Sequence, residues 1–250
     1  KREIKTIATF HHAKNLQRLN ADTYKKDLQK HAFTDHARRF SFNSHFPYLP
    51  GHATSSNDPE LQKLYGNMPK EQWHEKMWLG KLEEVIDNYD PDIVWFDSWL
   101  DQIPESYRQR FSAYYLNAAE KRKKNVAIIR KQEDLPLNYT INDHEKSREP
   151  KALPELWMTD DTLSTDSWSY TTDMKIKPVD MVLHSLIDTV SKNGVLLLNV
   201  SPTSQGIIPG DQRNVLLKMG QWLKENGKAI YSTRPWLTAA EGPSSAPPPG

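Results

Sequence analysis

The chain has 250 residues, 37% of them hydrophobic and 26% charged, which is the composition of an ordinary globular protein with one sizeable core. Its 33 basic and 32 acidic side chains give a formal net charge of +1, so no overall field favours nucleic acid or an anionic membrane. It has no cysteine for disulfides or thiolate metal sites, and no apolar run of the roughly 20 residues that a membrane helix needs. We therefore expect neither nucleic-acid binding nor membrane insertion.

Short apolar segments predict the strands of a parallel sheet. Each is rich in aliphatic or β-branched residues, leaves little room for polar alternation and closes near a polar residue, as in strands buried on both faces. In chain order these segments are residues 4–10, 92–97, 126–130 and 195–200, with a weaker fifth candidate at residues 155–159.

Apolar residues at helical spacing predict helices that alternate with these strands. They cover residues 78–89, residues 182–190 before the stop signal Asn193-Gly194, and residues from about 211 to Asn226-Gly227. Alternating strands and helices predict right-handed βαβ units, hence a doubly wound sheet or a (β/α)8 barrel. No glycine-rich phosphate loop follows a strand, which favours the barrel.

The predicted fold is therefore α/β, a TIM-like (β/α)8 barrel. Since only about five strands can be counted where a closed barrel has eight, we expect the first strands to be missing. Residues 1–236 are predicted to form a partial catalytic barrel, and residues 237–250 a disordered tail or linker rich in Pro, Ser and Gly. Residues 30–69 are predicted to form a long loop over the barrel mouth.

Asp97 closes an apolar strand, and in TIM barrels the carboxyl ends of strands carry the catalytic groups. Trp95 and Trp99 could supply an apolar wall beside it. The alternative is a structural carboxylate that caps the next helix or pairs with Arg108. Arg130 ends its strand in the same manner, and its guanidinium could bind sugar hydroxyls or form a structural ion pair.

Retaining glycosidases are one class of enzyme that uses a carboxylate such as Asp97 as a nucleophile. They need a second carboxyl group about 5 to 5.5 Å from the nucleophile, with a raised pKa. The residues alone leave four candidates open, which are Asp143, Glu145, Glu149 and Glu155. His11 and His12 are adjacent on a predicted strand and would point to opposite faces, so no metal site is predicted.

Four segments resemble α-L-fucosidases of glycoside hydrolase family 29. Residues 91–97 (PDIVWFD) resemble the family's nucleophile strand, and residues 166–170 (DSWSY) are similar to its Asn-Asp-Ser-Trp-Gly-Tyr segment. Residues 190–202 (VSKNGVLLLNVSP) are similar to its Val-Ser-Lys-Asn-Gly-Asn-Leu-Leu-Leu-Asn-Ile-Gly-Pro segment, and residues 211–231 to the end of its barrel. The family's His-His-Asp-Gly segment and its β-sandwich are not found in this chain.

The resemblance implies that Asp97 is the nucleophile, that Trp95 lines the sugar pocket and that Arg130 contacts the sugar. Trp168 lies in the matching Asp-Ser-Trp segment and is expected to bind substrate as well. The acid/base falls on a variable loop of the family, where Glu145 is preferred to Glu155. We expect the reaction to need no cofactor.

The activity implied by this resemblance is retaining hydrolysis of terminal α-L-fucose from glycans through a covalent glycosyl-enzyme intermediate. A fucosylated glycan or oligosaccharide would be the partner, and the family suggests a secreted, periplasmic or lysosomal location. Two alternatives stay open at this point. One is a retaining glycosidase for another sugar, and the other is a non-catalytic sugar-binding barrel fragment.

Overall fold

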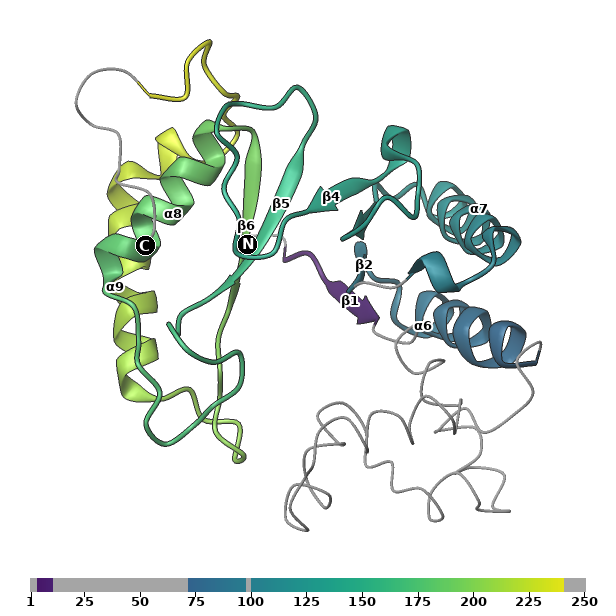
Figure 1. Cartoon of the computed structure of the whole chain (residues 1–250), viewed down its shortest axis with the longest axis horizontal. Helices are drawn as coiled ribbons and strands as arrows, with labels where there is room; N and C mark the ends of the chain where they lie inside the picture. Colours follow the sequence, from purple (N-terminus) through teal and green to yellow (C-terminus); the bar gives the residue numbers. More distant parts are fainter. Residues whose placement is uncertain (1–3, 11–71, 98–99, 241–250) are drawn as a thin grey trace, which may run out of the picture. The chain divides into compact units, whose positions relative to one another are not determined.

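The computed structural model describes residues 4–10, 72–97 and 100–240, and the chain divides into two compact units after Thr140. Both units are built from parallel strands and helices (Figure 1). The predicted loop at residues 30–69, the pair His11-His12 and Trp99 lie outside the described residues, as do residues 241–250 of the predicted tail.

The first unit contains three parallel strands in the order β1-β2-β3. Its elements are β1 (Ile7–Phe10), η2 (Trp73–Leu79), α6 (Gly80–Tyr89), β2 (Ile93–Phe96), η3 (Leu100–Gln102), α7 (Glu105–Lys121), β3 (Ala127–Arg130) and η4 (Leu137–Tyr139). The π-helical turn η2 leads directly into α6, so the two form one helical segment. All three strands point their carboxyl ends the same way.

Aromatic side chains fix the helices against one face of β2. Phe96 lies 5.0 Å, centroid to centroid, from the ring of Phe111 on α7 and 6.1 Å from that of Trp78 at the end of η2. All three rings, like Val94 on the same strand face, are at most 2% exposed. Because successive residues of a strand point to opposite faces, Trp95 and Asp97 project away from this packed layer.

The second unit also contains three parallel strands, in the order β4-β5-β6. Its elements are β4 (Ile141–Asp143), β5 (Trp157–Thr162), α8 (Val179–Ser191), β6 (Gly194–Asn199), α9 (Gly210–Asn226) and η5 (Gly227–Ala229). Helices α8 and α9 lie side by side next to β6 (Figure 1). Their apolar faces bury Val182, Val215 and Met219 together with Leu163, which follows β5.

The parallel α/β class predicted from the sequence is confirmed, and each predicted strand and helix overlaps an observed one. The expectation that the strands are buried on both faces is wrong for β1 and β6, where Ile7 and Val195 are 39% and 46% exposed. Helix α7 and strand β4 were not among the predicted elements, so the described residues hold six strands instead of five. No helix in these residues has the length and apolarity required to cross a bilayer.

Candidate active site

Asp97 lies directly after β2, at the carboxyl end of the parallel strands of the first unit. Its backbone N–H donates to the carbonyl oxygen of Phe10 at 3.1 Å, which continues the β1–β2 hydrogen-bond ladder one residue beyond the strand. The side chain of Asp97 is 15% exposed. Trp95, two residues earlier, belongs to the same face of β2.

Lys131 provides the ionic partner of Asp97. Its Nζ lies 2.9 Å from Asp97 Oδ1 and 5.2 Å from the centroid of the Trp95 ring, and its side chain is only 8% exposed. The β2–β3 register, which pairs Trp95 with Ile129, places Lys131 opposite Asp97 two residues further along. A neighbouring ammonium favours the ionised form of a carboxyl group, which is the form that acts as a nucleophile.

Arg108, the alternative partner of Asp97 in the sequence analysis, makes different contacts. Its Nε donates to the carbonyl oxygen of Ile103 at 3.0 Å, and its Nη1 donates to that of Asp134. The structure therefore gives Arg108 a role in holding two loop carbonyls, while Lys131 pairs with Asp97.

Arg130 is 7% exposed at the end of β3. Its Nη1 donates to the carbonyl oxygen of Gln132 at 3.0 Å, and the strand alternation directs it away from the face that carries Lys131. The next turn holds Asp134, which is 6% exposed. Burial raises the pKa of Asp134 to about 6, although the positive charges of Arg130 and Arg108 act in the opposite direction.

The four candidate acid/base residues have different surroundings in the second unit. Asp143, the last residue of β4, is 3% exposed and accepts the backbone N–H of Asp160 at 3.2 Å. Glu149 Oε1 lies 3.3 Å from His144 Nδ1. The side chains of Glu145 and Glu155 are exposed. Asp143 and Glu149 thus serve local structure, and this favours Glu145 and Glu155 as the residues that could reach a substrate.

Trp168 is anchored through its backbone. Its carbonyl oxygen accepts hydrogen bonds from Asn199 Nδ2 and Ser201 Oγ, both at 2.8 Å. The ring of Trp168 meets Lys146, whose Nζ lies 4.5 Å from the ring centroid. Because Lys146 is the neighbour of Glu145, this cation–π contact brings the turn of Glu145 next to Trp168.

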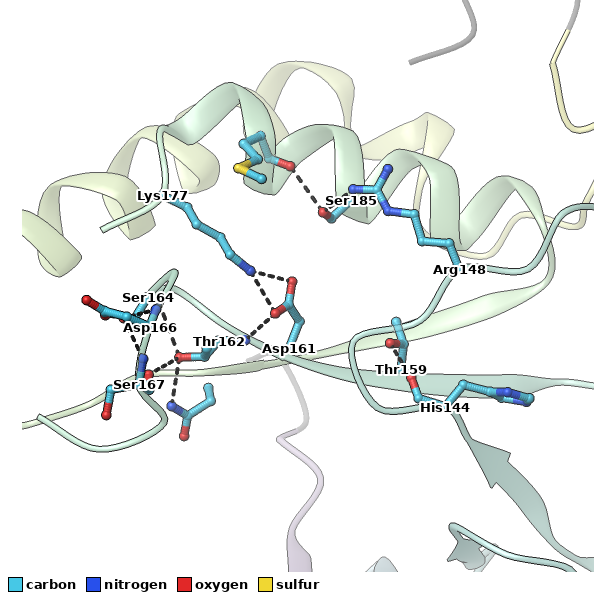
Figure 2. Close-up of polar contacts among 12 residues, drawn as sticks. His144, Arg148, Thr159, Asp161, Thr162, Ser164, Asp166, Ser167, Lys177 and Ser185 are labelled. Carbon is cyan, nitrogen blue, oxygen red and sulfur yellow. Dashed lines mark hydrogen bonds and ion pairs between the residues drawn. The ribbon is translucent and has the colours of Figure 1, made fainter. Parts of the chain in front are cut away.

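Short hydrogen bonds around β5 hold the segment before Trp168 in place (Figure 2). Ser164 Oγ donates to Asp166 Oδ1 at 2.5 Å and accepts the backbone N–H of Ser167 at 3.1 Å. Lys177 Nζ contacts both carboxylate oxygens of Asp161, at 2.7 and 2.8 Å. The loop that carries Trp168 is therefore a structured part of the second unit.

The described residues contain no group of three or more His, Asp or Glu side chains that could hold a metal ion. Lys131 contacts both Asp97 and the Trp95 ring, and Lys146, next to Glu145, contacts the Trp168 ring. Sequence reasoning missed Lys131 and the anchoring role of Asn199. For Lys131 the signal was available, since a lysine follows the apolar segment 126–130 just as Asp97 ends the segment 92–97.

The family model and the relatives that match this chain all belong to one enzyme family. A model of the alpha-L-fucosidase family matches residues 1–228. Mouse tissue alpha-L-fucosidase is 29% identical over 174 residues, which cover 65% of this chain and 37% of the relative. Human plasma alpha-L-fucosidase is 31% identical over 185 residues, which cover 70% of this chain and 39% of the relative.

A solved structure of Thermotoga maritima alpha-fucosidase in complex with fucose superposes with a TM-score of 0.55 at 27% identity. The superposition covers 67% of this chain and 36% of that one. The chain thus corresponds to well under half the length of each of these relatives.

Proposed function

Because the chain belongs to the alpha-L-fucosidase family, we propose that it takes part in hydrolysis of terminal α-linked L-fucose with retention of configuration. The observation that carries the proposal is the Asp97 carboxylate at the carboxyl end of β2, held 2.9 Å from Lys131 and beside the Trp95 ring. Carboxyl ends of parallel strands are where barrel enzymes place their catalytic groups.

In the first step the Asp97 carboxylate attacks the anomeric carbon of fucose. A covalent bond forms between Asp97 and the sugar, the glycosidic bond breaks, and Glu145 gives its proton to the leaving oxygen. The intermediate has the anomeric configuration opposite to that of the substrate.

In the second step Glu145, now ionised, takes a proton from water as the water attacks the anomeric carbon. The bond to Asp97 breaks, and the second inversion restores the α configuration. Two carboxyl groups and water balance the reaction, so it needs no cofactor.

Two further side chains are proposed to bind the sugar. Trp95 and Trp168 offer aromatic faces on which the apolar side of fucose could stack, whereas Arg130, which is directed away from the face of Lys131, is not assigned the sugar contact expected from the sequence. Fucose is neutral, which agrees with the net charge of +1. The human relative is named a plasma enzyme, and on that basis we propose that this protein is exported.

The proposal is tested with aryl α-L-fucosides, following the anomeric configuration of the first-formed product by NMR. Release of α-L-fucose before mutarotation is the expected result. Release of β-L-fucose would contradict the two-step mechanism. A panel of other aryl glycosides tests the sugar, since faster turnover of a different glycoside would assign another specificity. Binding of fucose without turnover would indicate a non-catalytic sugar-binding protein.

A further inference from the structure

We propose that Lys131 is a positioning residue for the reaction at Asp97, whose ammonium group keeps the carboxylate ionised and fixes its direction. This inference rests on the proposed role of Asp97 as the nucleophile. Lys131 is neither one of the two proposed catalytic carboxyl groups nor one of the proposed sugar-binding residues.

The geometry confines Lys131 to this site. Its ammonium lies 2.9 Å from Asp97 Oδ1 and 5.2 Å from the centroid of the Trp95 ring, so a carboxylate and an aromatic face both contact one cation. Lysine side chains are rarely buried unless they are paired. Lys131 is such a buried and paired lysine, since its side chain is only 8% exposed. Burial removes rotamer freedom, and the pair is therefore held in one arrangement.

Burial also strengthens the electrostatic effect. An exposed ion pair is screened by water and contributes little, whereas an opposite charge within about 4–6 Å of a carboxyl group in a shielded site lowers its pKa by about 1 to 3 units. With side-chain exposures of 8% and 15%, the Lys131–Asp97 pair belongs to the shielded class. Lys131 is thus expected to keep Asp97 ionised at acid pH.

Other charged groups of the first unit lie near Asp134. Arg130, Arg108 and Asp101 all act electrostatically on the Asp134 carboxyl group. Lys131 itself contacts Asp97 directly, with its Nζ 2.9 Å from Asp97 Oδ1. The titration of Asp97 should therefore respond to removal of the Lys131 charge.

The attack changes the charge that Lys131 faces. Before the reaction it faces a carboxylate, and after the sugar–Asp97 bond forms it faces a neutral ester while the leaving oxygen carries the proton from the acid. Lys131 therefore stabilises the reactive form of Asp97 in the free enzyme, which is the state that the acid limb of kcat/KM reports.

The test compares Lys131→Met, which removes the charge, with Lys131→Arg, which keeps it. Lys131→Met should move the acid limb of kcat/KM upward by about 1 to 3 pH units, and Lys131→Arg should leave the limb near its original position. In parallel, NMR of ¹³C-labelled aspartate carboxyl groups, with Asp97→Asn used for assignment, measures the Asp97 pKa without any substrate. The same upward shift is expected in Lys131→Met.

Lys124→Met is the matched control. Lys124 Nζ lies 3.2 Å from Asp92 Oδ1 just before the opposite end of β2, and its removal should leave the Asp97 titration unchanged. An equal Asp97 pKa in the original chain and Lys131→Met would overturn the inference. So would an equal upward shift in Lys131→Arg and Lys131→Met, because the effect would then come from packing. Absence of fucosidase activity would refute the proposed function, while the carboxyl titration would still decide the role of Lys131.

Discussion

Replacement of Asp134 by Asn should stabilise the protein at neutral pH. The carboxyl group is 6% exposed, and its burial raises the pKa from 3.8 to about 6. Above that pH the folded chain must bury a negative charge, which the nearby Arg130 and Arg108 offset only in part. Asn has nearly the same size and carries no charge, so it removes this cost.

The sign and size follow from proton linkage. Between pH 3.8 and about 6 the folded chain holds a proton on Asp134 that the unfolded chain has lost. The contribution of Asp134 to stability is therefore greatest below the unfolded pKa and is lost as the pH rises through the folded pKa. A difference of about 2 pKa units corresponds to about 3 kcal/mol in total, of which about 1.4 kcal/mol falls between pH 5 and pH 8.

The assay is urea unfolding of the original chain and of Asp134→Asn at several pH values from 5 to 8. The stability advantage of the Asn variant should grow with pH by about 1.4 kcal/mol over this range. Glu133→Gln, which removes an exposed carboxyl group from the same turn, should show no such trend. A constant difference between Asp134→Asn and the original chain would refute the argument that burial raises this pKa.

Three further variants test other parts of the account. Glu145→Ala should lower the rate of hydrolysis of fucosides with poor leaving groups by about 10²- to 10⁴-fold, and that of activated aryl fucosides far less. Added azide should restore turnover and give α-L-fucosyl azide. The same behaviour in Glu155→Ala would transfer the acid/base role to Glu155. Gly194→Ala should lower the free energy of unfolding by about 1–3 kcal/mol, because its Cβ would lie 2.6 Å from the Trp157 ring, and an unchanged urea midpoint would contradict this packing. Asn199→Ala removes a donor to the Trp168 carbonyl and should raise KM more than it lowers kcat, whereas an unchanged KM would separate this anchor from sugar binding.

The sequence predicted elements whose signal is local. The segments 92–97 and 126–130 are apolar and end on charged residues, and both form strands of a parallel sheet. Strand β4 was not predicted because Ile141 is its one apolar residue, a pattern too short to be distinguished from a loop. Helix α7 was not predicted either: its buried Phe111, Tyr115 and Ala119 recur every four residues, but the apolar residues Tyr114 and Leu116 that lie between them obscure the one-faced pattern.

The site was predictable only where one residue carried the signal. Asp97 follows its strand directly, so its place at the sheet edge could be inferred from the chain itself. Its partner Lys131 lies 34 residues further along, and the pairing depends on the β2–β3 register and on burial. A lysine after a strand ordinarily indicates a solvated surface, and the sequence gives no measure of the 8% exposure that changes this interpretation.

The central claim is that Asp97 attacks the sugar, and azide rescue of Asp97→Gly tests it most directly. The variant should fold normally and hydrolyse aryl α-L-fucosides at a small fraction of the original rate, since the cavity holds no nucleophile. Added azide should occupy the position of the lost carboxylate, attack the same face of the sugar and yield β-L-fucosyl azide, the inverted product. Appreciable hydrolysis without azide, or formation of the α azide, would contradict the assignment of Asp97 as the nucleophile.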